Sequence, residues 1–100
     1  MLSIKLINRG TEGELRIVGR LDANSAADAE RIITETIARF DSLTLDMAQL
    51  EYVSSAGLRA LKRAHIAMRR KGGALTVKNV TKSVMEVFEI TGFAGMLRFV

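Results

Sequence analysis

LDMAQLEYVSSAGLRAL, from Leu45 to Leu61, changes its hydrophobic pattern partway along. At the start, apolar and polar side chains alternate, which is typical of a strand, and from Gly57 onward apolar residues recur every three or four positions, which is typical of a helix. Two serines, Ser54 and Ser55, stand where the helix should begin. The segment therefore predicts a strand, a short loop and a helix that starts at a serine.

The sequence on both sides of this segment continues the alternation of strands and helices. The predicted elements are two strands around the turn at 10–13 (the first ending near Ile7), a helix over 23–40, strands at 43–47 and 75–78 on either side of the helix at 57–71, a helix around 84–88 that stops at Gly92, and an edge strand at 97–100. The order is β-β-α-β-α-β-α-(β), which implies right-handed crossovers and mostly parallel pairing. We expect one α/β domain over residues 1–100, with a four- to five-stranded mixed sheet packed against helices.

The composition argues against catalysis and metal binding. The chain has no cysteine and one histidine, His65, so the usual zinc sites and disulfides are excluded. His65 lies ten residues after Ser55 on the same predicted helix, about three turns away, and so cannot act as its base. No glycine-rich phosphate loop is present. We expect no enzyme activity, no metal and no cofactor.

The charge is basic overall and unevenly distributed. Lys and Arg number 15 against 11 Asp and Glu, a net charge of +4. Through Leu58 there are six Lys and Arg against nine Asp and Glu, and from Arg59 onward there are nine against two. A nucleic-acid partner is disfavoured because the five aromatic residues are not interleaved with the basic ones. No apolar run is long enough for a membrane span and no export leader is evident, so we expect a cytoplasmic monomer.

The serines and two aspartates are the candidate functional side chains. A serine at a helix start normally caps an unpaired backbone N–H, but the same N–H groups and the helix dipole also suit a phosphoryl group. Asp22 follows one predicted strand and Asp46 lies near the end of the next, so both are expected near Ser55 at the carboxyl edge of the sheet. Each aspartate also has a local interpretation, as a helix cap or a turn residue.

The helix after the serines has one basic side. Arg59, Lys62 and Arg63 lie on that side, and Ile66 falls at its centre. Such a side is either merely solvated or, because an apolar residue sits within a ring of cations, a contact for a protein with an acidic surface. Gly57 either allows close packing of the helix on the sheet or lets a kinase backbone reach Ser55.

Three ordered motifs resemble the STAS domain, the fold of anti-sigma factor antagonists. Residues 52–61, YVSSAGLRAL, preceded by Leu45 and Asp46, resemble its signature; residues 19–23, GRLDA, resemble its second-strand-to-first-helix element; residues 91–93, TGF, resemble the end of its last long helix. Together they cover nearly the whole chain. The resemblance implies a STAS fold and a regulatory partner switch.

In that switch, an anti-sigma factor that is also a serine kinase binds the unphosphorylated antagonist and releases its client. Alignment of Gly57 and Leu58 with the family's Gly-Leu places the phosphoacceptor on Ser55, with Ser54, which replaces a common Asp, as second choice. A separate serine phosphatase is implied as a second partner. The residues expected to contact the kinase are Asp22, Asp46, Ser54, Ala56, Gly57, Arg59, Lys62, Arg63 and Ile66. The alternatives are a structural STAS subunit of a transporter or stress-signalling scaffold and, less favoured, a nucleic-acid-binding domain.

Overall fold

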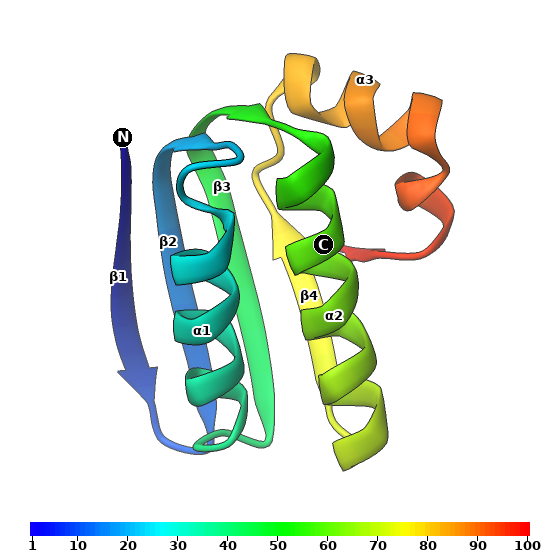
Figure 1. Cartoon of the computed structure of the whole chain (residues 1–100). Coiled ribbons are helices and arrows are strands. Elements are labelled where there is room, and N and C mark those ends of the chain that lie inside the picture. Colours follow the sequence, from blue (N-terminus) through cyan, green and yellow to red (C-terminus); the bar gives the residue numbers. More distant parts are fainter.

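Strands and helices follow one another in the predicted order. In the computed structural model, which describes residues 1–100, the elements are β1 (Leu2–Arg9), β2 (Glu12–Leu21), α1 (Ala26–Ile37), β3 (Ser42–Val53), α2 (Ser55–Lys71), β4 (Ala74–Lys78), α3 (Lys82–Thr91), a 3-10 helix (Phe93–Gly95) and β5 (Arg98–Phe99) (Figure 1). The expected α/β class and element order are confirmed, and the C-terminal edge strand exists as two residues.

The five strands form one mixed sheet in the order β1-β2-β3-β4-β5. β1 is antiparallel to β2, and every other neighbouring pair is parallel. Parallel neighbours need a crossover between them, and α1 and α2 supply the crossovers from β2 to β3 and from β3 to β4. Both helices lie on the same face of the sheet (Figure 1).

The main core lies between this face and the two helices. Leu15 and Ile17 of β2 and Leu45 of β3 are buried there, together with Ile33 of α1 and Leu61 of α2. These strand residues belong to the alternating apolar pattern, and the helix residues belong to the three-to-four-residue pattern. The apolar sides of the strands and of the helices therefore face each other. Their contact removes both apolar surfaces from water.

The opposite face of the sheet is polar. Thr44 and Thr76 share a hydrogen bond of 2.9 Å across β3 and β4. Glu14 is only 4% exposed and pairs with Lys78 at 2.9 Å, Arg16 at 3.4 Å and Arg9 at 3.6 Å. The hydrogen bond from Lys78, with the charges of Lys78 and Arg9, outweighs desolvation and lowers the pKa of Glu14.

Strand β3 is longer than predicted. The expected loop after residue 47 is wrong, because the strand continues to Val53. Its pairing with β2 shifts twice, between the partners of Arg16 and Val18 and between those of Gly19 and Arg20. Each shift leaves an extra residue on β3, and such bulges interrupt the alternation of faces. The second half of β3 therefore lacks the regular alternation of apolar and polar residues by which a strand is predicted from sequence.

Other boundaries differ by a few residues. β1 continues past Ile7 to Arg9, and α2 begins at Ser55 rather than Gly57. Helix α1 begins at Ala26 rather than at residue 23, because the backbone between Asp22 and Ser25 forms a hydrogen-bonded turn. It ends at Ile37, three residues before the predicted end at 40. None of these shifts moves an element to another place in the fold.

Candidate functional site at the start of helix α2

The carboxyl ends of β2 and β3 hold the start of α2 close to the sheet. Leu21 pairs with Val53, and the backbone N–H of Ser54 donates to the carbonyl oxygen of Leu21 at 2.9 Å. A Cβ placed on Gly57 would lie 2.8 Å from both the Cγ and the carbonyl oxygen of Leu21. Gly57 is buried, so its role in the structure is close packing of α2 on β2.

The two serines occupy different positions at this helix start. Ser54 is the N-cap, and its Oγ accepts a hydrogen bond from the backbone N–H of Gly57 at 3.2 Å. Its carbonyl oxygen accepts from Leu58 at 2.8 Å. Ser55 is the first residue of the helix and is exposed, and its hydroxyl makes no hydrogen bond within the chain. The capping role that the sequence allows for either serine thus belongs to Ser54.

Asp22 lies at the same edge of the sheet, one residue beyond β2. Its carboxylate accepts hydrogen bonds from the backbone N–H groups of Asn24 at 3.0 Å and Ser25 at 3.2 Å. Desolvation would raise the pKa of Asp22, but these hydrogen bonds and one from the Ser25 hydroxyl outweigh it and lower that pKa. Asp22 therefore stays ionised and shapes the turn that leads into α1. Its predicted placement at the edge that holds Ser55 is confirmed.

Asp46 does not lie at this edge, and its predicted position is wrong. It sits in the middle of β3, opposite Arg16 of β2 and Lys78 of β4. Its carboxylate accepts from the backbone N–H of Ala48 at 3.0 Å and from the side chain of Asn79 at 3.2 Å, and lies 3.9 Å from Arg16. The error follows from the length of β3, since the strand continues for seven residues beyond Asp46, to Val53.

A hollow of about 330 Å³ lies between the first turns of α1 and α2. It is lined by Ala23, Ala26, Ala27, Glu30, Ala56, Arg59 and Arg63. Small side chains make up its apolar part, and Glu30 pairs with Arg63 at 3.0 Å beside it. The predicted contact residues Ala56, Arg59 and Arg63 thus line one hollow, which begins at the residue after Ser55.

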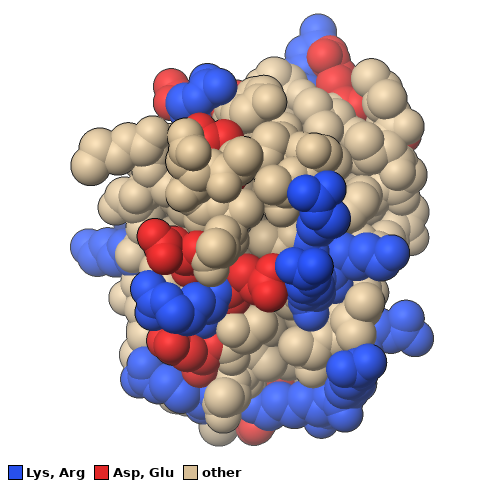
Figure 2. Space-filling model, viewed as in Figure 1, with Lys and Arg blue, Asp and Glu red and all other residues tan.

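The rest of the predicted contact surface runs along the outer side of α2. Lys62 is exposed, and Ile66 is 36% exposed although it is a large apolar residue. Lys and Arg side chains gather over this side of the molecule in Figure 2. The basic side with an apolar centre, predicted from the helical pattern, is therefore present in the structure.

A cation–π pair at the same edge of the sheet is not predicted by the sequence. The guanidinium of Arg20 lies 4.4 Å from the centre of the Tyr52 ring, and Tyr52 is 40% exposed. The two residues face each other because of the second register shift of β3. The only signal in the sequence is a tyrosine two residues before Ser54, which does not reveal its partner.

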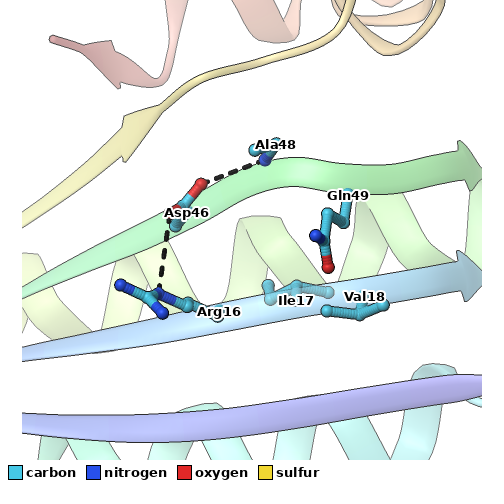
Figure 3. Close-up of a pocket in the computed structure, with 6 residues that line it drawn as sticks. All are labelled: Arg16, Ile17, Val18, Asp46, Ala48 and Gln49. Atoms are coloured by element: carbon cyan, nitrogen blue, oxygen red, sulfur yellow. Dashed lines mark hydrogen bonds and ion pairs between the residues drawn. The ribbon is translucent and has the colours of Figure 1, made fainter.

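The first register shift creates a second hollow, of about 200 Å³, between β2 and β3. Figure 3 shows Asp46 and Gln49 of β3 on one side of it and Arg16 and Val18 of β2 on the other. Half of its lining residues are polar, namely Arg16, Asp46 and Gln49, and half are apolar, namely Ile17, Val18 and Ala48.

Three further observations concern acidic clusters, the single histidine and the length of the helices. No three Asp, Glu, His or Cys side chains converge as metal ligands would. His65 is half-buried on α2, far along the helix from Ser55. Of the helices, none combines the length and the apolar character needed to span a bilayer.

Comparison with known proteins identifies the domain family of the chain. A family model for the STAS domain matches residues 4–100. BtrV of Bordetella bronchiseptica, named as an anti-sigma factor antagonist, is 37% identical over 76 residues, which are 72% of this chain and 66% of that protein. The chain thus spans just under two thirds of the length of that relative.

Solved structures share the fold. An anti-sigma factor antagonist from Mycobacterium paratuberculosis has a TM-score of 0.87 at 17% identity, over 99% of this chain and 85% of that one. SpoIIAA in its unphosphorylated form has a TM-score of 0.83 at 16% identity, over 98% and 88%. Bacillus SpoIIAA in its phosphorylated form has 0.74 at 15%, over 100% and 91%. At these identities the likeness shows the fold.

Proposed function

Because this chain belongs to the STAS domain family, we propose that it is an anti-sigma factor antagonist that works by exchange of partners. The unphosphorylated form binds an anti-sigma factor that is also a serine kinase, and this binding frees the client of the anti-sigma factor. Phosphorylation of Ser55 blocks binding, and a serine phosphatase reverses the block. The observation that supports this proposal is the exposed, unbonded hydroxyl of Ser55 at the first turn of α2.

Ser55 is a better phosphoacceptor than Ser54 on structural grounds. The Ser54 hydroxyl oxygen already accepts the hydrogen bond from Gly57, and the residue is half-buried. The Ser54 hydroxyl also serves as the helix cap, a contact that contributes about 0.5–2 kcal/mol to helix stability. Ser55 can be modified without loss of any hydrogen bond within the chain.

The contact surface of the proposed function begins at Ser55 and follows α2. Arg59 is one helical turn after Ser55, and Lys62 and Ile66 follow on the same side. A phosphoryl group adds about −1.5 to −2 charges at pH 7. At Ser55 it would offset the positive charge of Arg59 and Lys62 that attracts acidic groups of the kinase, and it would add a desolvation cost at the contact.

Three predicted contact residues need a revised role in this proposal. Gly57 is covered by Leu21, so it contributes through the packing of α2 rather than by touching the kinase. Arg63 is already paired with Glu30, which reduces its attraction for a further acid. Asp46 is left out because it lies away from Ser55 in the middle of the sheet.

The test has a phosphorylation arm and a binding arm. The protein is incubated with ATP and the serine kinase encoded nearest to it, and the phosphosite is mapped by mass spectrometry. We expect phosphate on Ser55, no phosphate on Ser55→Ala, and normal phosphorylation of Ser54→Ala. In calorimetry with the same kinase, Ser55→Asp should weaken binding at least tenfold, whereas Ser55→Ala should bind as the unmodified protein does.

Two results would contradict the proposal. One is the absence of phosphate from both serines under conditions in which the kinase is active on ATP. The other is equal affinity of Ser55→Asp and Ser55→Ala for the kinase, because the charge at residue 55 would then not control binding.

A further inference from the structure

We propose that the C-terminal half of α2 is a second docking site, which binds an acidic segment of a partner protein that carries an apolar side chain. Ile66, Arg69 and Arg70 line a surface hollow of about 310 Å³ at this place. The inference goes beyond the proposed function because it assigns Arg69 and Arg70 an occupant whose binding does not depend on the state of Ser55. Ile66 is the residue at which this site adjoins the surface proposed for the kinase.

The first support is the charge that the chain leaves unpaired on α2. The helix has six Lys and Arg and no Asp or Glu. Two of the six are used within the fold: Arg63 pairs with Glu30, and the Lys71 ammonium donates to the carbonyl oxygens of Ile37 and Phe40. The other four, none of which has a carboxylate within ion-pair distance, are Arg59, Lys62, Arg69 and Arg70.

The helix dipole explains only the C-terminal part of this arrangement. Cations in the last turn of a helix are favourable, and Arg69, Arg70 and Lys71 all lie there. Arg59 and Lys62 lie in the first half of the helix, where the dipole gives a cation no benefit. The dipole thus leaves Arg59 and Lys62 unexplained, and an acidic partner that binds along the helix would use them together with Arg69 and Arg70.

The second support is the apolar residue at the centre of the row. At about 100° per residue, the four unpaired cations all fall within about 60° of Ile66 around the helix axis. Ile66 is 36% exposed, and the hollow beside it is walled by Arg69 and Arg70. An apolar anchor within a rim of arginines is a frequent composition of protein–protein hot spots.

The same observations favour a protein over other anionic partners. A membrane-surface helix needs a broad apolar face, but the apolar face of α2, with Leu61 and Met68, is buried in the core. Phosphates of a nucleic acid would pair with the cations but would leave Ile66 and the hollow unused. An acidic segment with one apolar side chain uses both.

The site lies beyond the electrostatic reach of a phosphate on Ser55. Arg69 is 14 residues further along α2, which corresponds to about 21 Å. The Debye length at physiological ionic strength is about 8 Å, so a charge at Ser55 is largely screened at Arg69. The partner segment at this end should therefore remain bound whether or not Ser55 is modified.

The probe for the test is a short fluorescent synthetic peptide in which glutamates flank one leucine, titrated in fluorescence anisotropy against the full chain. We expect Arg69→Gln/Arg70→Gln to weaken binding at least tenfold and Ile66→Ala to weaken it about fivefold. Ser55→Asp should change it less than twofold. The matched control, Lys5→Gln/Lys82→Gln, removes two positive charges from exposed residues on β1 and α3 and should also change it less than twofold. Thermal melting shows that each variant is folded.

Each remaining outcome would overturn the inference. If both double variants lose affinity equally, the peptide responds to net charge and not to a site. If Ile66→Ala binds normally, the apolar centre has no part in recognition. If duplex DNA or phosphatidylglycerol vesicles bind more tightly than the peptide and lose binding in Arg69→Gln/Arg70→Gln, the occupant is not an acidic protein. A large effect of Ser55→Asp would make this end part of the serine switch.

Discussion

The contact of Gly57 with Leu21 shows how single atoms set the position of the candidate site. The carbonyl oxygen of Leu21 belongs to β2 and also accepts a hydrogen bond from Ser54, so it is held in place. Any side chain at residue 57 would push α2 away from this oxygen. The exposure of Ser55 at the strand ends thus depends on the absence of one methyl group.

Gly57→Ala should destabilise the fold by about 1–3 kcal/mol, since overpacking at fixed backbone outweighs the better helix propensity of alanine. The added Cβ would lie 2.8 Å from the Leu21 carbonyl oxygen. Urea unfolding measures the loss. Gly95→Ala is the control, because no atom lies within 4 Å of its Cβ position. Equal stability of the two variants would contradict the packing role.

The lowered pKa of Glu14 makes the stability of the fold depend on pH. Its pKa is lowered in the fold by Lys78, so around pH 4.3 the unfolded chain takes up a proton that the folded chain does not. From about one pH unit above that value, Glu14 contributes its full share to the free energy of unfolding. This contribution is lost as the pH falls through the lowered pKa of the folded state.

Glu14→Gln should therefore lower the free energy of unfolding by about 1–3 kcal/mol at pH 7, where the buried pair with Lys78 is lost. The difference from the unmodified protein should shrink as the pH is lowered below about 4. Urea unfolding across this range measures it, with the exposed Glu89→Gln as control. A difference that grows toward low pH would be the wrong sign.

At the scale of elements, α2 was predicted well and β3 was not. The helical period of residues 57–71 depends on local contacts with one buried side, so its basic side and Ile66 were placed correctly. The end of β3 depends on its register with β2, and the extra residues at the two shifts break the alternation by which a strand is found. Asp46 was misplaced, and the Arg20–Tyr52 pair was missed, for the same reason.

The start of α2 gives a prediction that separates the two serines. Ser54→Ala should cost about 0.5–2 kcal/mol, because the N–H of Gly57 loses its acceptor. Ser55→Ala should stay within about 0.5 kcal/mol of the unmodified protein, as exposed substitutions usually do. Denaturant midpoints of the two variants make the comparison. An equal loss in both would mean that the cap is shared.

On the scale of the whole molecule, the positive and negative charges that are unevenly distributed along the sequence are also unevenly distributed over the surface. The cations that follow Leu58 are concentrated on α2, and α1 beside it carries Asp28, Glu30 and Glu35. A partner with an acidic surface is therefore attracted to one side of the molecule. Such attraction acts on the rate of association more than on the lifetime of the complex.

Association with the kinase should accordingly slow as salt is added. Between about 50 and 500 mM NaCl we expect the association rate constant to fall about tenfold or more, with a smaller change in the dissociation rate. Surface plasmon resonance separates the two rates. Lys62→Gln should reduce the salt dependence, whereas Lys5→Gln should not. A salt effect confined to dissociation would contradict electrostatic steering.

The mixed sheet also has a kinetic consequence. β1 and β2 are joined by a tight turn, and isolated hairpins form in about 1–10 μs, whereas the parallel pairing of β2 with β3 must wait for α1 to close a long loop. The edge that holds Ser55 belongs to the later pairing. During synthesis on the ribosome, we therefore expect the chain to acquire its hairpin first and to become recognisable to a kinase only after β3 and α2 have emerged.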